Sequence, residues 1–293
     1  YDAFSISQLD KTNLLLAVES IPAYIEQASM FMVLCPLVEH QQLLSEDGRH
    51  SQVLSQSSWE SRGWCRMEGV CRLLSRSSGP VIFIHSEKHY EIGALQDIFF
   101  KPVGEGLFHL AQDKEMIGVP LANLVQSRLA ELAHSGRNPR AFHFLRAAWP
   151  VLFSGLQAIP DIVVPDAPAD DVPLPPLFYA VLSRNLEGVK TLVEGRADVN
   201  AVAEGTVDGG IINEDAFGFS VLMAALFTCR SEQDWPILDY LKAAGADMEY
   251  ATPCSGRTPG ITPLMVALDI NPLGAKWFLL NLPVGYKFCE HER

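Results

Sequence analysis

The sequence predicts an α/β layer with a doubly wound sheet, followed by an all-α solenoid of repeated helix pairs. Two short, continuously apolar segments, Met30–Cys35 and Val81–Ile84, alternate with helical patterns in the first half. That order is typical of βαβ units. In the last third, three similar segments recur, and each opens a helix. We therefore expect two architectures in one chain.

The composition fits a folded protein with two cores. The chain has 293 residues, of which 48% are hydrophobic and 19% charged, and this length suffices for two domains. Its net charge of −13 argues against binding to nucleic acid or to an anionic membrane surface, because such affinity comes largely from Lys and Arg. No apolar run approaches the roughly 20 residues of a transmembrane helix.

The six cysteines indicate an intracellular, reducing compartment and no metal site. None forms a Cys-x-x-Cys pair, and no His stands beside them at metal-ligand spacing. Cys35 and Cys229 lie in apolar segments and are expected to be small buried residues. The chain begins at Tyr1 rather than Met, so we expect an upstream segment, with the cytoplasm favoured and an organelle as the alternative.

The first elements follow from apolar runs and breakers. Residues 1–8 predict a strand, and Thr12 or Asn13 is expected to cap a helix that runs to about Ala28. Pro22 either kinks that helix or starts a second one. The run over residues 30–35 predicts a strand that is buried on both faces.

The next elements complete the α/β layer. Residues 41–58 are polar and predict a loop, residues 64–74 a helix, and residues 81–84 another buried strand. Two further helices are expected over 122–132 and 140–156. We place four regions along the chain: an α/β domain over 1–118, a helical extension over 119–158, a Pro/Asp-rich linker over 159–174 and repeats over 175–293.

The repeats resemble ankyrin repeats. Their openings are Pro176–Ala180, Val221–Ala225 and Pro263–Ala267, and Thr262-Pro263-Leu264 is similar to the family's Thr-Pro-Leu-His-x-Ala start. A second helix follows each opening, over residues 186–194, 236–244 and 274–280. Gly195 and Gly245 are expected to supply a positive φ at the ends of two of these helices.

Two lengthened hairpins between the repeats are the predicted partner-binding surface. They span residues 202–215 and 250–260, and the candidate contacts are Glu204, Asp208, Glu214, Asp215 and Arg257. The acidic first hairpin predicts a basic or polar protein partner and an association weakened by salt. Tolerated loop growth is the alternative, since long surface loops cost little.

The first 90 residues resemble a TIR domain. Ser61–Glu68 follows the strand that ends at Pro36 and matches the family's Ser-x-x-Trp-Cys-x-x-Glu element, while residues 1–8 are similar to a strand of fungal HET domains. The whole chain resembles the TIR/HET-like ankyrin proteins of dinoflagellates. The resemblance implies an NAD-cleaving pocket with Glu68 as catalytic carboxylate and Arg62, Trp64 and Arg66 as NAD contacts.

The chemistry implied for Glu68 has a structural alternative. A carboxylate near the ribose stabilises the oxocarbenium-like state of nicotinamide–ribose cleavage. Glu68 can equally be a helix carboxylate that pairs with Arg72 or Arg66, and Trp64 can pack between helix and sheet. The first TIR strand or its loop is unmatched in this sequence, so we expect an incomplete pocket.

A second candidate site follows the strand over residues 81–84. His85, Glu87 and His89 lie where α/β sheets place ligands, although polar residues there are usually loop. The function expected is that of an interaction scaffold or assembly subunit, which binds a protein partner in a larger complex through its repeats and needs no cofactor. The alternative is an NAD-cleaving hydrolase with NAD as its substrate.

Overall fold

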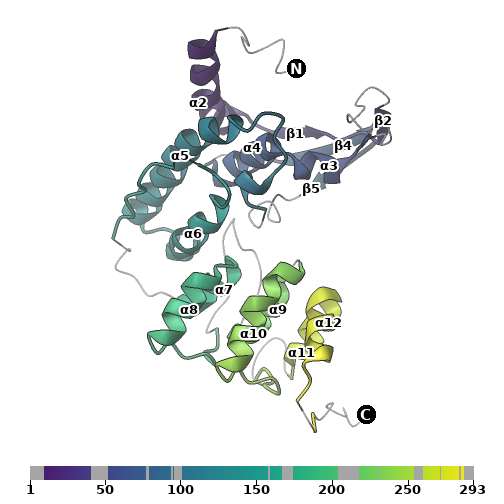
Figure 1. The fold of residues 1–293 in the computed structure, drawn as a ribbon, viewed down its shortest axis with the longest axis vertical. Coiled ribbons are helices and arrows are strands. Elements are labelled where there is room, and N and C mark those ends of the chain that lie inside the picture. The colour runs from purple at the N-terminus through teal and green to yellow at the C-terminus, as the bar shows by residue number, and fades with distance from the viewer. Residues whose placement is uncertain are drawn as a thin grey trace. The chain divides into compact units, whose positions relative to one another are not determined.

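The computed structural model describes the chain in two compact units. The sheet unit comprises residues 1–131 with 149–165, and the repeat unit comprises 132–148 with 166–293 (Figure 1). The described residues are 10–40, 52–76, 79–93, 95, 101–157, 159–166, 174–203, 218–229, 231–253, 260–270, 272–283 and 285–286. The strand predicted over residues 1–8 therefore lies outside the described residues.

The sheet unit alternates helices with short strands. Its elements in order are α2 (Lys11–Gln27), β1 (Phe31–Leu34), β2 (Val38–His40), β3 (Gln52–Leu54), α3 (Gln56–Ser61), α4 (Gly63–Leu74), β4 (Val81–Ser86), β5 (His89–Gly93) and the 3₁₀ turn η2 (Val103–Glu105). Two longer helices follow, α5 (Asp113–Ser135) and α6 (Pro139–Leu152), and the division between the units passes through both.

The three-stranded sheet is mixed and has the order β1-β4-β5. β1 pairs with β4 in parallel, with Val33 beside Phe83, and β4 forms an antiparallel hairpin with β5. Val33 and Phe83 are buried, and the Trp59 ring of α3 packs edge-on against Phe31 and Phe83. This face of the sheet is therefore covered by α3.

The opposite face of the sheet is exposed, which corrects the prediction of strands buried on both faces. Met32 and Leu34 of β1 alternate with the buried Val33, and both are exposed, as are Tyr90 and Ile92 of β5. A continuous apolar run is typical of a strand that is covered on both faces. Such a run also fits a strand with one apolar face left uncovered, and the sequence alone does not distinguish the two.

Two predicted loops contain regular structure. Within the segment predicted as loop over residues 41–58, the described part holds β3 and the start of α3, and β3 pairs antiparallel with β2. The residues after Ile84 continue β4 to Ser86 and form β5 from His89, so the turn is confined to Glu87 and Lys88. Short strands that are rich in polar residues show little hydrophobic periodicity, so the sequence did not predict β3 and β5.

The helix α2 starts two or three residues earlier than predicted. Asp10 is its N-cap, and the Asp10 carboxylate accepts hydrogen bonds from the backbone N–H groups of Thr12 and Asn13. The helix continues through Pro22 without a break. Its C-terminal end is held by Arg72 of α4, which donates to Ala28 O at 3.2 Å and to Gly79 O at 2.6 Å.

From residue 174 on, the described part of the repeat unit contains three stacked helix pairs. They are α7 (Pro176–Leu182) with α8 (Leu186–Glu194), α9 (Val221–Thr228) with α10 (Trp235–Ala243), and α11 (Pro263–Ile270) with α12 (Pro272–Leu280), and the 3₁₀ turn η3 (Glu232–Asp234) precedes α10. The first helices α7, α9 and α11 contact one another in sequence, and α8 contacts α10. All six predicted helices are confirmed, each within a few residues.

The turns after α8 and α10 join neighbouring repeats. Gly245 has a φ of +92°, as predicted, but after α8 Arg196 takes the positive φ of 69° in place of Gly195. Asn200 in the first turn donates its side-chain N–H to Gly245 O at 3.1 Å and accepts from the Asp247 backbone N–H at 2.8 Å. The turn after α8 is therefore hydrogen-bonded directly to the turn after α10. Among the described helices, none is long and apolar enough to cross a membrane.

Candidate functional site

The junction between α3 and α4 carries the predicted NAD-binding residues. Arg62 lies between the two helices and is exposed. Leu107 clamps the junction, since its N–H donates to Ser61 O at 2.8 Å and its carbonyl accepts from Gly63 N–H at 2.9 Å. A Cβ on Gly63 would stand 1.9 Å from the Phe108 ring, so only glycine allows this close approach.

Trp64 and Arg66 direct their polar atoms into the fold. The indole N–H of Trp64 donates to Asp113 Oδ2 at 3.0 Å, and its ring packs edge-on against Phe108. Arg66 donates from Nε to Glu60 O and from Nη1 to Pro102 O, both at 2.8 Å. Burial lowers the pKa of Arg66, although the charges of Glu105 and Glu60 oppose this. Both side chains therefore hold α4 to the segment over residues 102–113.

Trp64 does not occupy the position between helix and sheet that was expected of it. Trp59, four residues before Gly63, fills that position, with its ring centroid 6.4 Å from Phe31 and 6.3 Å from Phe83. The sequence offered a signal, because Trp59 stands in a short Ser-capped helix between apolar strands. Because the residues around Trp59 are polar, the segment before it was predicted as a loop.

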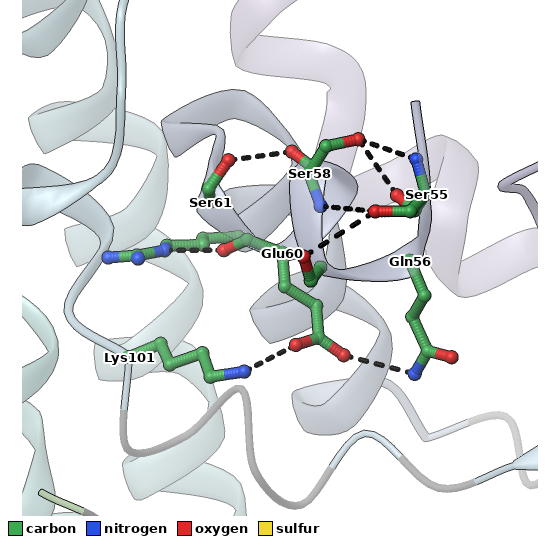
Figure 2. A network of polar contacts seen from close by, with 8 residues as sticks. Ser55, Gln56, Ser58, Glu60, Ser61 and Lys101 are labelled. Atoms are coloured by element: carbon green, nitrogen blue, oxygen red, sulfur yellow. Dashed lines mark hydrogen bonds and ion pairs between the residues drawn. The ribbon is translucent and has the colours of Figure 1, made fainter. Parts of the chain in front are cut away.

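A polar network around Glu60 was also missed by the sequence analysis. Figure 2 shows Lys101 and Gln56 pointing at the two carboxylate oxygens of Glu60. Gln56 donates at 3.0 Å, and Lys101 forms an ion pair. Ser55 and Ser58 close a capping box at the start of α3. The network holds α3 against residue 101. The Glu60 carboxylate is neutralised by Lys101.

Glu68 lies half-buried in the middle of α4, three residues before Cys71. Burial raises the pKa of the Cys71 thiol, and the Glu68 charge adds to this effect. The Arg72 guanidinium, one of the two predicted partners of Glu68, donates to Ala28 O and Gly79 O. Trp64, Arg66 and Glu68 thus share α4, and Arg62 caps it, but two of the three predicted NAD contacts hold the fold together.

The carboxyl end of the parallel strands carries a chain of thiol, imidazole and carboxylate. Cys35, directly after β1, places Sγ 3.5 Å from His85 Nδ1, and His85 Nε2 lies 3.3 Å from Glu91 Oε1. The His89 ring lies beside that of His85, with 4.9 Å between the centroids and 31° between the ring planes. Of the predicted second site, His85 and His89 are brought together, whereas Glu87 is exposed in the turn.

The Cys35 thiol is poorly suited to nucleophilic attack. Cys35 is 3% exposed, and burial raises the pKa of its thiol, an effect that the Ile84 hydrogen bond opposes and the Glu91 and Glu60 charges reinforce. The thiol is therefore protonated near neutral pH. A protonated thiol that donates to Nδ1, with Nε2–H donating to Glu91, is a satisfied hydrogen-bond chain that closes the sheet end.

The bases of both lengthened hairpins are closed by backbone hydrogen bonds. Ala203 N–H donates to Phe219 O at 2.9 Å, and Thr252 N–H donates to Ile261 O at 2.9 Å. The Tyr250 hydroxyl donates to Gly218 O at 2.8 Å and so connects the two bases. The candidate contacts Glu204, Asp208, Glu214, Asp215 and Arg257 all lie outside the described residues.

Within the described ranges, no group of three or more His, Cys, Asp or Glu side chains is arranged to hold a metal ion. The sequence matches no protein-family model and no curated protein.

Proposed function

We propose that the chain is an interaction scaffold or assembly subunit. In this proposal its ankyrin-like repeats bind a protein partner through the two hairpins, and its TIR-like unit is not catalytic. The four described cysteines, Cys35, Cys65, Cys71 and Cys229, are all buried, which suits an intracellular, reducing compartment. The whole binding surface then lies on the repeat unit.

The observation that carries this proposal is the pair of closed hairpin bases on a stack that is already packed. The helix pairs bury their own apolar positions, with Leu222, Met223 and Phe278 almost fully inaccessible. Insertions beyond Ala203 and Thr252 therefore add nothing that the core of the repeats requires. Insertions of this kind enlarge the surface that is available to a partner.

The charge of the first hairpin indicates the chemistry of the partner. Residues 204–217 contain Glu204, Asp208, Glu214 and Asp215 and no Lys or Arg. A surface of one sign favours a partner of the opposite sign and speeds their encounter at low salt. We therefore assign a basic protein surface as the partner. The NAD-cleaving alternative has less support, because Trp64 and Arg66 are engaged within the fold.

The proposal is tested with two matched variants in a pull-down from the native source. In the first, residues 204–217 are replaced by Asn-Gly, which closes a two-residue hairpin. In the second, the length is kept and the four acids become Gln or Asn. Both should lose partners that the parent captures, whereas Arg257→Gln should lose fewer. Retention of every partner by the folded trimmed protein would exclude the first hairpin as the docking site.

A further inference from the structure

The exposed face of the sheet forms a regular apolar patch in the sheet unit. The pairing register places Met32, Ile82 and Ile92 in one row and Leu34, Ile84 and Tyr90 in the next. We call these six residues the outer grid. Partners in register point to the same side of a sheet, and β1, β4 and β5 lie next to one another in Figure 1.

The outer grid is accessible at its edges and partly covered at its centre. Met32 and Leu34 are each 58% exposed, Tyr90 is 68% exposed and Ile92 is 74% exposed. Ile82 and Ile84 on the central strand are half-buried. The alternate residues Val33 and Phe83 are 2% exposed. One face of the sheet is therefore buried, and the face that carries the outer grid is exposed.

We propose that the outer grid is the contact surface of a homodimer, in which it packs face to face against the outer grid of a second copy of this chain. From these exposures, the accessible surface of the outer grid on one copy is on the order of 600 Å². This is at the top of the range for the largest apolar patch on a typical monomer. Two copies would bury on the order of 1,200 Å², the lower end of stable interfaces. The area therefore fits a weak, reversible dimer.

A second copy suits this surface because the outer grid is self-complementary. All six side chains are apolar or aromatic, so a two-fold axis through the grid brings like against like without opposing charges. Two sheets packed in this way stand about 10 Å apart, with side chains interdigitating. At the β4–β5 turn, Glu87 and Lys88 are of opposite sign, and Glu91, between Tyr90 and Ile92, pairs with Phe83 and so belongs to the other face of the sheet.

The net charge of −13 gives the dimer a distinctive salt dependence. Two copies repel each other at long range, and salt screens that repulsion while leaving apolar burial intact. The dimer should therefore strengthen as salt is added. The hairpin-mediated association proposed above should weaken under the same change, so the two proposals succeed or fail separately.

Sedimentation velocity of the full chain over a range of concentrations tests the dimer. The parent should shift from monomer to dimer as concentration rises, with a dissociation constant in the micromolar range or weaker. Ile92→Lys should raise that constant at least about tenfold, because the burial of a charge on an apolar surface is costly. This variant also lowers the net negative charge, so increased repulsion cannot explain a loss of dimer.

Val163→Lys is the matched control. Val163 is a β-branched residue that is 69% exposed outside the sheet, so the same charge is added to a similar side chain. It should leave the dimer intact, and Tyr90→Lys should weaken it as Ile92→Lys does. Circular dichroism confirms that each variant is folded. A parent that stays monomeric at every concentration, or a dimer unchanged in both grid variants, overturns the proposal.

Discussion

Arg184 donates from Nε to Asp234 Oδ1 at 2.6 Å and joins the first repeat to the second. Arg184 stands in the turn after α7 with a φ of 57°, and Asp234 precedes α10. Their side chains are only 15% and 8% exposed. The Asp234 carboxylate also accepts from the backbone N–H of Ser231 at 2.9 Å. The pair is thus a largely buried connection between repeats.

Removal of the cation alone should destabilise the repeat unit strongly. Arg184→Leu leaves the Asp234 carboxylate without its cation partner, and such losses cost about 3–5 kcal/mol. Urea unfolding followed by circular dichroism measures the change. In the double variant Arg184→Leu/Asp234→Asn the loss should be clearly smaller, because the charge itself is gone. Equal losses in the single and double variants would mean that the charge pair is not the cause.

The two tryptophans of the α3–α4 region should differ in their contribution to stability. Trp59→Ala removes a buried ring from between α3 and the sheet, and such truncations cost about 3–5 kcal/mol. Trp64 is half-buried, so Trp64→Ala should cost less. Thermal melts of both variants beside the parent give the order. A larger loss for Trp64 would reverse the assignment of core positions.

The helices of the repeat unit could be predicted from the sequence because several independent signals agree there. Pro stands at the first position of α7 and α11, Ser220 caps α9, and Gly195 and Gly245 follow α8 and α10. The positive φ at Arg196 in place of Gly195 was not predictable, because the sequence does not show at which of these two neighbouring residues the backbone turns. The side-chain link from Asn200 to the next turn also requires the stacked structure.

The sheet unit was harder to predict because its strands are short. Apolar runs located β1 and β4, but the sequence does not say whether a helix covers the outer face. The chain of Cys35, His85 and Glu91 depends on the pairing of β1, β4 and β5, and its members are up to 56 positions apart in the printed numbering. The polar residues after Ile84 therefore indicate His85, but nothing in the sequence links it to Cys35 or Glu91.

The stability of the repeat unit should depend on the protonation of His143. Burial lowers the pKa of His143 from its ordinary value of 6.5, and the Arg146 charge adds to this. The His143 ring stacks on Tyr179 at 5.4 Å. Since the folded pKa lies below the unfolded one, stability is fully present above about pH 6.5 and is lost as the pH falls below it.

The substitution His143→Phe isolates this effect, because it keeps the stacked ring and removes the titration. The difference in unfolding free energy between parent and variant should move against the parent as the pH falls from about 7.5 to about 5.5. Urea melts at each pH provide the measurement. Parallel curves for the two proteins would show that His143 keeps its ordinary pKa in the fold.

The chain should not cleave NAD at a rate above background. Trp64 and Arg66 hold α4 to the rest of the sheet unit, so the implied NAD contacts are engaged elsewhere. Incubation with NAD followed by an assay for nicotinamide tests this directly. Nicotinamide release that Glu68→Ala abolishes, while Glu115→Ala on exposed α5 surface leaves it intact, would establish the enzyme instead of the scaffold.

The Cys35 thiol should react slowly with iodoacetamide in the folded protein. Burial raises the pKa of Cys35 above its ordinary value of 9.0, and alkylation requires the thiolate. Peptide mapping after timed labelling should show Cys35 modified far more slowly than in urea, with a rate that keeps rising through about pH 9. The variant His85→Ala should not slow it further, since the imidazole only accepts a hydrogen bond from the thiol and does not take its proton. If Cys35 instead alkylates faster in the folded protein than in urea, and His85→Ala removes that advantage, the imidazole activates the thiol. The carboxyl end of β1 and β4 would then be a nucleophilic site.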